Sequence, residues 1–259
     1  MDLGIYDIGN CGTNLTILER FSIYKSMGFT HVGFYMDNSY LDGENYKDLF
    51  EVASNLGLKV EQVHLDYKNS NMFADNSENE FFNYLENKIN EGVKYGVKHL
   101  IVHASKGDNP PPISHFSLNK LVYFDKMLNG SDTKLCFENV RNNSNINDVI
   151  NLKLNNIGMC YDSGHAHAYS NEVELLSKYG SIICCTHLHD NIGQDTHQII
   201  GSGSIDWATI YPLLNKTNRC VDYLECFMER NIVVTKDRFR KFVEQAYNAY
   251  KTMVGGCDE

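Results

Sequence analysis

Residues 133–168 read TKLCFENVRNNSNINDVINLKLNNIGMCYDSGHAHA, and this stretch contains the repeat from which the fold follows. Two short apolar runs, 133–138 and 156–162, have the composition of buried β-strands, and the segment 145–153 between them has the apolar spacing of a helix. Strands joined by a helical crossover run parallel, because the crossover returns the chain to the same edge of the sheet. The stretch therefore predicts a strand, helix, strand unit.

The same alternation extends from this stretch in both directions to the ends of the chain. Strands are expected near residues 2–8, 30–36, 58–64, 97–103, 133–138, 156–162, 181–188 and 220–225. Helices are expected near residues 13–28, 44–56, 77–95, 116–129, 145–153, 171–179, 205–214 and 234–251. Eight such units close a barrel, whereas a doubly wound sheet normally has fewer. We therefore predict a single (β/α)8 TIM barrel.

The chain shows no feature of an interdomain linker. Its 259 residues match the usual size of such a barrel, about 250 residues. Three of the four prolines form the run 110–112, in the loop after the fourth predicted strand. We therefore expect one domain, residues 1–259.

The composition is that of an acidic globular protein. Lys and Arg number 23 against 33 Asp and Glu, which gives a net charge of −10 and argues against non-specific nucleic-acid binding. No run approaches the roughly 18–20 apolar residues that cross a bilayer, and the first residues lack the order of a signal peptide, so a cytoplasmic protein is expected. The eight cysteines include no CxxC pair and are expected to be reduced core thiols.

Six of the eight predicted strands end in a residue that can bind a metal or move a proton. These residues are His64, His103, Glu138, Asp162, His187 and Glu225. His165 follows Asp162 by one turn, and the long loop after the seventh strand adds Asp195 and His197. Barrel enzymes build their active sites at the carboxyl ends of the strands, so these side chains should converge.

Such a convergence indicates a divalent metal. A buried carboxylate costs several kcal/mol unless a cation or hydrogen bonds compensate it, although one alone could be a satisfied structural group. Four carboxylates and five imidazoles on one rim would repel each other without metal. Imidazole mixed with carboxylate and no thiolate favours Zn²⁺ or Mn²⁺, with Co²⁺ or Fe²⁺ as alternatives, whereas Ca²⁺ prefers oxygen ligands alone.

The order of these residues resembles the xylose isomerase-like TIM barrel superfamily, which includes endonuclease IV-type enzymes and many sugar isomerases and epimerases. The segment 187–207, HLHDNIGQDTHQIIGSGSIDW, is especially similar to the sugar phosphate isomerase/epimerase branch. The resemblance implies that Glu138, Asp162, His187 and Glu225 form a shared single-metal core. In the trinuclear arrangement of the endonuclease-like members, the further ligands are His64, His103, His165, Asp195 and His197. One to three ions are thus expected.

Two mechanisms fit the same residues. In an isomerase or epimerase of a small sugar or sugar phosphate, the metal would stabilise an enediolate while Glu138 or Glu225 moves a proton at carbon. In a zinc phosphodiesterase of the endonuclease IV type, two or three ions would act on the backbone of abasic DNA. A barrel that only binds a metal-chelating ligand is a third possibility, weakened by the presence of every ligand type together.

The loops at the rim favour a small carbohydrate substrate over nucleic acid. The loop DNSYLDGEN after the second strand is acidic, and the rim cations are few: Lys68, Lys106, Arg141 and Arg230. A negative net charge does not exclude a local positive groove, however. The aromatic residues Tyr40, Tyr67 and Phe73 could line either kind of pocket.

Three further residues are candidates for contact with substrate. Arg141 could bind a phosphate or carboxylate group, or equally form a salt bridge at the start of the fifth helix. Lys106 lies in the loop after the fourth strand, and His189 alternates with His187 along the seventh. The Arg and the second Glu that ketose 3-epimerases of this superfamily typically add are absent from the expected neighbourhoods, so a free-ketose 3-epimerase is disfavoured.

Overall fold

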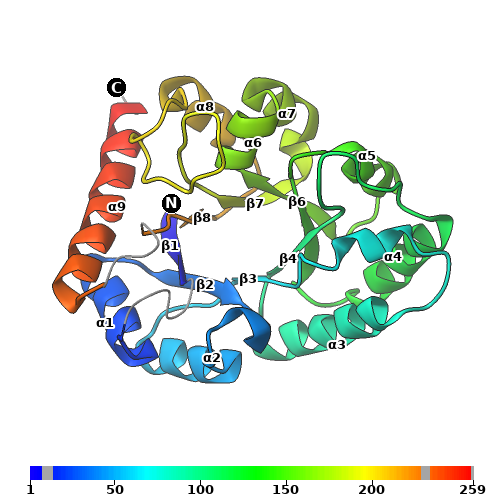
Figure 1. The fold of residues 1–259 in the computed structure, drawn as a ribbon, viewed down its shortest axis with the longest axis horizontal. Helices are drawn as coiled ribbons and strands as arrows, with labels where there is room; N and C mark the ends of the chain where they lie inside the picture. Colours follow the sequence, from blue (N-terminus) through cyan, green and yellow to red (C-terminus); the bar gives the residue numbers. More distant parts are fainter. Residues whose placement is uncertain (8–13, 229–233, 258–259) are drawn as a thin grey trace.

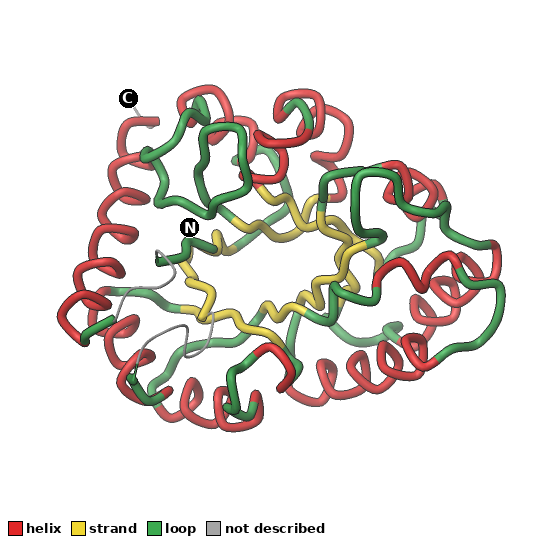
Figure 2. The backbone as a smooth tube through the Cα atoms, viewed as in Figure 1, coloured by secondary structure: helices red, strands yellow, loops and turns green. Residues whose placement is uncertain are grey.

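The computed structural model describes residues 1–7, 14–228 and 234–257. Its parallel strands form one sheet that closes into a barrel, seen as the central ring in Figure 2. The strands are β1 (Asp2–Asp7), β2 (His31–Tyr35), β3 (Gln62–His64), β4 (His99–His103), β5 (Lys134–Glu138), β6 (Ile157–Asp162), β7 (Ile183–His187) and β8 (Val221–Leu224). β1 pairs with both β2 and β8, and a parallel bridge between Leu188 and Leu224 joins the last two strands. The predicted (β/α)8 barrel is confirmed.

Helices surround the ring of strands (Figure 1). They are α1 (Ile17–Met27), α2 (Tyr46–Asn55), α3 (Glu80–Tyr95), α4 (His115–Met127), α5 (Ser144–Asn151), α6 (Ser163–Tyr169), α7 (Glu172–Tyr179), α8 (Trp207–Leu214) and α9 (Lys236–Cys257). α9 packs against both α1 and α8, so the last helix closes the outer layer over the first strand. No helix in the described ranges combines the length and the apolarity that a bilayer crossing requires.

The helix α6 is the main element that the sequence pattern did not predict. Asp162, the last residue of β6, caps it by accepting a hydrogen bond from the backbone N–H of His165 at 2.6 Å. The segment is too short, at 7 residues, to show a helical period, although an Asp directly before a helix is a favoured cap. This cap holds His165 close to the end of β6.

Smaller differences concern the ends of strands and the loops. β3 was predicted over 58–64 but contains only Gln62–His64, and Lys59 forms just an isolated bridge to His31. Short 3-10 helices occupy Asn38–Tyr40, Ser70–Ala74 and Gly180–Ile182. The predicted burial of the cysteines is wrong for Cys220, which is exposed because it lies in the turn leading into β8. Cys11 lies outside the described residues.

A buried ion-pair network ties β1 to α1. Arg20, with no exposed surface, donates from Nε and Nη2 to both carboxylate oxygens of Asp7 at 2.9 Å. The same guanidinium donates from Nη1 and Nη2 to Glu44 at 2.9 and 2.6 Å. Each charge in the network therefore has an opposite partner, which is the condition for burying it.

Candidate functional site

The carboxyl ends of the strands bring the predicted ligands to one mouth of the barrel. His103 at the end of β4 lies beside Glu138 at the end of β5, and Asp162 of β6 lies beside His187 of β7. Residues at equivalent positions of neighbouring parallel strands point to the same face, and in this barrel that face is the interior. The ligand atoms at this mouth form four overlapping groups: a central group, two flanking groups, and a group of His189, His197 and Glu225 that links the central group to one of them.

The central group consists of Glu138, Asp162, His187 and Glu225, whose ligand atoms all lie within 4.8 Å of one another. All four side chains are buried. His187 Nδ1 lies 3.2 Å from Glu138 Oε2 and 3.1 Å from Glu225 Oε2, yet neither ring nitrogen of His187 makes a hydrogen bond to a described residue. A divalent cation between the imidazole and the carboxylates would bond to these buried polar atoms, which otherwise lack partners. The residues fit a metal.

The second group joins His64 and His103 to Glu138. Their Nε2 atoms lie 3.2 and 3.4 Å from Glu138 Oε2. The opposite nitrogen of His64, Nδ1, is 2.6 Å from the backbone carbonyl of Leu65. An Nδ1–H that donates to this carbonyl fixes the tautomer and leaves the lone pair of Nε2 free for a cation, as at many metal-binding histidines.

The third group consists of His165, Asp195 and His197. Both imidazoles place Nε2 at 3.2 Å from the Asp195 carboxylate. Both place Nδ1 at 2.9 Å from a backbone carbonyl, that of Asn139 for His165 and that of Glu225 for His197. The orienting contact seen at His64 thus recurs at two more histidines, which indicates three ligands held in advance.

The backbone at His197 supports a functional role for this residue. Its φ is 48°, in the left-handed region that residues with a side chain seldom adopt. The ring of Phe227 stacks on the imidazole at 3.9 Å and 10°, and His189 stacks on it at 3.9 Å and 16°. A costly backbone conformation that is held by packing on the imidazole is typical of functional sites.

The charges of the central group depend on one another. Burial disfavours the charge on Glu138, but the imidazoles of His187 and His103 outweigh this cost and hold the pKa of the carboxyl well below its usual value. Burial likewise opposes the charge on His187, but Glu225 and Glu138 outweigh it and raise the pKa of the imidazole well above its usual value. In the absence of a cation the raised pKa favours a proton on His187, so metal and proton compete for this imidazole.

The three predicted substrate contacts lie at different depths. His189 is fully buried, with Nε2 at 3.1 Å from Asp162. Arg141 is exposed, donates to Asp108 Oδ1 at 2.9 Å, and lies over the Tyr169 ring at 4.7 Å. Lys106 lies 5.8 Å from the centre of the Tyr67 ring, which lies 5.5 Å from that of His103. Lys106 and Arg141 are therefore each separated from the candidate metal ligands by one aromatic ring. Arg230, the other arginine expected at the rim, lies outside the described residues.

An aromatic wall flanks His64. Tyr35 and Tyr40 stack at 4.9 Å and 13°, and Tyr35 and Tyr67 lie 4.9 and 5.9 Å from the His64 ring. Tyr35 was missed from the sequence because it ends a strand without being a metal ligand. The prediction that Phe73 lies at this mouth is wrong: it is buried against Phe81, because the 3-10 helix after β3 turns it into the core.

Two residues that the ligand pattern did not include hold the site together. The Asn139 amide donates to the Asp162 carbonyl and accepts from the Asp162 N–H, both at 2.8 Å. Asp190 holds the loop after β7: it accepts from the backbone of Gly201 at 2.8 Å and from Trp207 Nε1 at 2.9 Å. That loop contains Asp195 and His197. The sequence signal for Asn139 was its place directly after Glu138.

Comparisons with known proteins agree with this geometry. The family described as xylose isomerase-like TIM barrel matches residues 21–245 of the chain. The curated protein sequences gave no match.

Solved structures share the fold at low sequence identity. A fusion of a xylose isomerase-like TIM barrel with 4-hydroxyphenylpyruvate dioxygenase aligns with a TM-score of 0.76 and 12% identity over 99% of this chain, which spans 43% of the fusion. An L-ribulose 3-epimerase gives 0.74 and 16% over 100% of this chain and 95% of its own. The IOLI protein, whose structure holds a zinc atom, gives 0.71 and 18% over 99% and 98%.

Proposed function

The chain belongs to the xylose isomerase-like TIM barrel family, and from this premise we propose that it is a divalent-metal-dependent isomerase or epimerase of a small sugar or sugar phosphate. One observation carries the proposal. Two buried glutamates, Glu138 and Glu225, approach the same imidazole of His187 within 3.2 and 3.1 Å. Two carboxylates at one cation site can remove a proton from carbon and return it elsewhere.

The relatives of similar fold support the class of reaction. The L-ribulose 3-epimerase acts, by its name, on a ketose, and the IOLI structure contains zinc. Zn²⁺ and Mn²⁺ are the cations that four-ligand sites of carboxylate and imidazole favour. We extend both properties to this chain as part of the proposal.

The roles of the residues follow from their positions. Glu138, Asp162, His187 and Glu225 would hold the cation, which supplies a positive charge that stabilises the enediolate oxygens. Glu138 and Glu225 would transfer the proton, because burial at the barrel mouth excludes water that would compete for it. Tyr35, Tyr40 and Tyr67 offer flat surfaces beside the site for the sugar.

Lys106 and Arg141 would bind the distal end of the substrate. Each lies beyond an aromatic ring that contacts a ligand histidine, Tyr67 for Lys106 and Tyr169 for Arg141. A cation at this depth is placed for a phosphate group several bonds away from the reacting carbon. This arrangement favours sugar phosphates within the proposed class. His189 would act on the metal centre through its contact with Asp162.

A second candidate, hydrolysis of a phosphodiester such as the backbone of abasic DNA, is favoured by one specific observation. The groups His64, His103, Glu138 and His165, Asp195, His197 flank the central group and are complete. Sites with two or three cations stabilise the attacking and leaving oxygens of phosphoryl transfer. The acidic loop after β2 and the scarcity of rim cations among the described residues argue against a DNA backbone at this mouth.

The deciding experiment combines metal content with two assays. Protein purified without chelator or affinity metal is assayed with ketoses and their phosphates in D2O, where proton transfer at carbon introduces deuterium that NMR detects, and with an abasic duplex. We expect about one ion per chain at the barrel mouth, deuterium exchange and no strand cleavage. Three zinc ions with cleavage and no exchange would contradict the isomerase and establish the hydrolase.

Variants assign the activity to the site. Glu138→Gln should abolish deuterium exchange, because it removes both a base and a ligand, whereas Glu86→Gln, at a carboxylate of α3 that accepts a hydrogen bond from Tyr123, should leave the exchange intact. Asp195→Asn distinguishes the proposed isomerase from the alternative hydrolase. An isomerase that uses the central group should keep its rate within about tenfold, whereas a hydrolase that needs the third ion should lose 10²-fold or more.

A further inference from the structure

A cluster of thiols lies one layer below the candidate metal centre. Cys136, Cys160 and Cys185 precede Glu138, Asp162 and His187 by two residues on their strands. Since every second residue of a strand points to the same face, these cysteines point into the barrel. Together with Ile101 they form a small buried cluster that is separate from the main core, and Cys184 packs against it.

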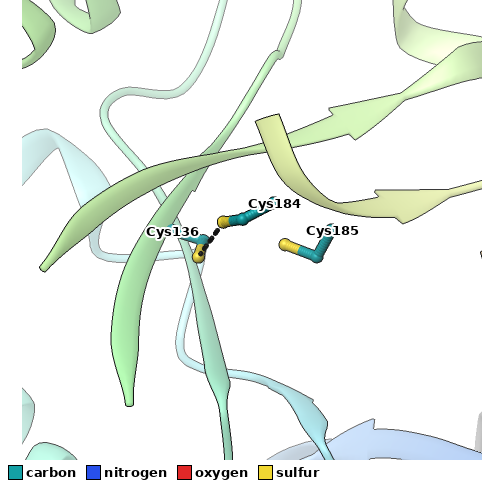
Figure 3. A group of neighbouring side chains, drawn as sticks. All are labelled: Cys136, Cys184 and Cys185. Atoms are coloured by element: carbon teal, nitrogen blue, oxygen red, sulfur yellow. Dashed lines mark hydrogen bonds between the residues drawn. The ribbon is translucent and has the colours of Figure 1, made fainter. Parts of the chain in front are cut away.

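A β-bulge turns a further cysteine into this layer. Met159 pairs with Ile183, and the next residue of β6, Cys160, pairs with Cys185, so that Cys184 is an extra residue in β7. In a regular strand Cys184 and Cys185 would point to opposite faces, but a bulge re-aims the side chain of the inserted residue. The thiols of Cys136, Cys184 and Cys185 all lie within 4.8 Å of one another (Figure 3).

A glycine provides the space in which the thiols meet. Cys136 of β5 lies beside Gly158 of β6, and a Cβ at Gly158 would lie 2.6 Å from Cys184 Sγ and 3.4 Å from Cys136 Sγ. Over this glycine the sulfurs of Cys136 and Cys184 approach to 3.2 Å, the contact dashed in Figure 3. Any larger residue at position 158 would separate them.

We propose that Cys136, Cys184 and Cys185 form a second metal site, which binds one soft d10 cation, Zn²⁺ or Cu⁺. Metal to sulfur bonds of about 2.3 Å place tetrahedral thiolates about 3.8 Å apart. The sulfurs of Cys136 and Cys184 are closer than this, at 3.2 Å, and every pair of the three sulfurs lies within 4.8 Å. The cation would sit beneath the centre, away from the barrel mouth.

A disulfide is a poorer explanation of the cluster. Cys136 and Cys184 lie on strands separated by β6, so that their backbones are about 9–10 Å apart at the usual strand spacing. A disulfide requires Cα atoms within about 7 Å. A cation that bonds to each sulfur spans the longer distance.

The burial of the three cysteines leaves a route by which a metal can enter. Cys184 is half-buried, whereas Cys136 and Cys185 are buried, so an ion can enter beside Cys184.

Cobalt substitution tests this site independently of the proposed function, because the ligands at the barrel mouth include no sulfur. The full chain is titrated with Co²⁺ in the presence of a phosphine reductant, and near-ultraviolet absorption from thiolate-to-cobalt charge transfer is recorded. We expect one equivalent of this absorption in the wild type, its loss in Cys136→Ser and Cys184→Ser, and its retention in Cys226→Ser. Cys226 is a buried free cysteine outside the cluster and serves as the control.

A measurement on the unmodified chain covers the case in which a variant fails to fold. Alkylation of Cys184 is mapped by mass spectrometry with and without Cd²⁺, and Cd²⁺ should slow it at least tenfold while leaving the exposed Cys220 unaffected. Absence of the charge-transfer absorption from the wild type, or equal alkylation of Cys184 with and without Cd²⁺, would overturn the proposal and leave the thiols as core packing. Sugar isomerisation would be unaffected by that outcome.

Discussion

At the scale of single residues, the site is held by backbone atoms as much as by the ligands themselves. The Nδ1 atoms of His64, His165 and His197 each contact a backbone carbonyl, and each Nε2 faces a carboxylate. Because the carbonyls belong to strand ends and the residues directly after them, the barrel orients these imidazoles before any metal binds. Orientation in advance lowers the entropy lost on binding.

Gly164 allows His189 to reach Asp162. A Cβ at Gly164 would lie 1.9 Å from His189 Cε1 and 2.3 Å from its Nδ1, so Gly164→Ala must displace this ring. We expect a loss of about 1–3 kcal/mol in the free energy of unfolding, the usual cost of overpacking, and a weaker central site. Chemical denaturation with and without zinc measures both effects.

The control for this prediction is Gly180→Ala. A Cβ at Gly180 meets nothing within 4 Å, and its φ of −51° suits any residue. This variant should have wild-type stability and zinc affinity. A Gly164→Ala protein that also matched the wild type would mean that His189 has room to move without consequence.

At the scale of elements, the loop after β7 contains the metal ligands Asp195 and His197 and is held in place by one carboxylate, that of Asp190. Asp190 accepts hydrogen bonds from the backbone of Asn191, Gly201 and Ile205 at 2.8, 2.8 and 3.2 Å, and from Trp207 Nε1 at 2.9 Å. An amide in its place has one acceptor oxygen and turns its NH2 group toward these donors. The loop positions the third group.

Asp190→Asn should therefore weaken the third metal group selectively. We expect its affinity for zinc to fall by about 10–100-fold, while the central group keeps its own, as is usual when a residue that orients a ligand is lost. Competition with a chromophoric chelator resolves the two classes of site. The matched control is Asp206→Asn, since Asp206 caps α8 by accepting from Thr209 N and asparagine caps as well as aspartate.

The network of Arg20, Asp7 and Glu44 belongs to the same scale, because it connects β1, α1 and the loop before α2. Asp7→Asn leaves the buried guanidinium with one partner fewer, and we expect a loss of about 3–5 kcal/mol in the free energy of unfolding. The exposed pair of Lys236 with Glu19 provides the control. Glu19→Gln should leave stability close to that of the wild type in urea denaturation, and equal losses in the two variants would show that burial of the Arg20 network adds nothing.

At the scale of the whole molecule, the barrel was predictable because the strands are compact apolar runs separated by helical segments, and six of the eight predicted strands end in a candidate ligand. The sequence located Glu138, Asp162 and His187 at their strand ends, where the structure places them. It could not locate α6, which is too short to show a period. It also could not show the bulge at Cys184, because a bulge depends on the register between two strands rather than on either strand alone.

Removal of metal should lower the stability of the entire barrel, because the central ligands come from β5, β6, β7 and the end of β8. A ligand that binds only the folded state stabilises it by about 2.7 kcal/mol at 100 times its Kd. We expect a chelator to lower the Tm by several degrees and added zinc to restore it, as measured by calorimetry. Glu225→Gln should reduce this metal-dependent gain, whereas Glu172→Gln, on α7, should retain it.

The gain in Tm from zinc should shrink as the pH falls. Burial opposes protonation of His187 and His165, but the facing carboxylates outweigh it and raise the pKa of both imidazoles. These nitrogens therefore take up protons at a pH above the ordinary value for histidine, about 6.5, and must release them to bind metal. The difference in Tm between zinc-loaded and chelated protein should therefore already decline as the pH falls toward the ordinary histidine value. A difference independent of pH would mean that the bound zinc is not held by these imidazoles.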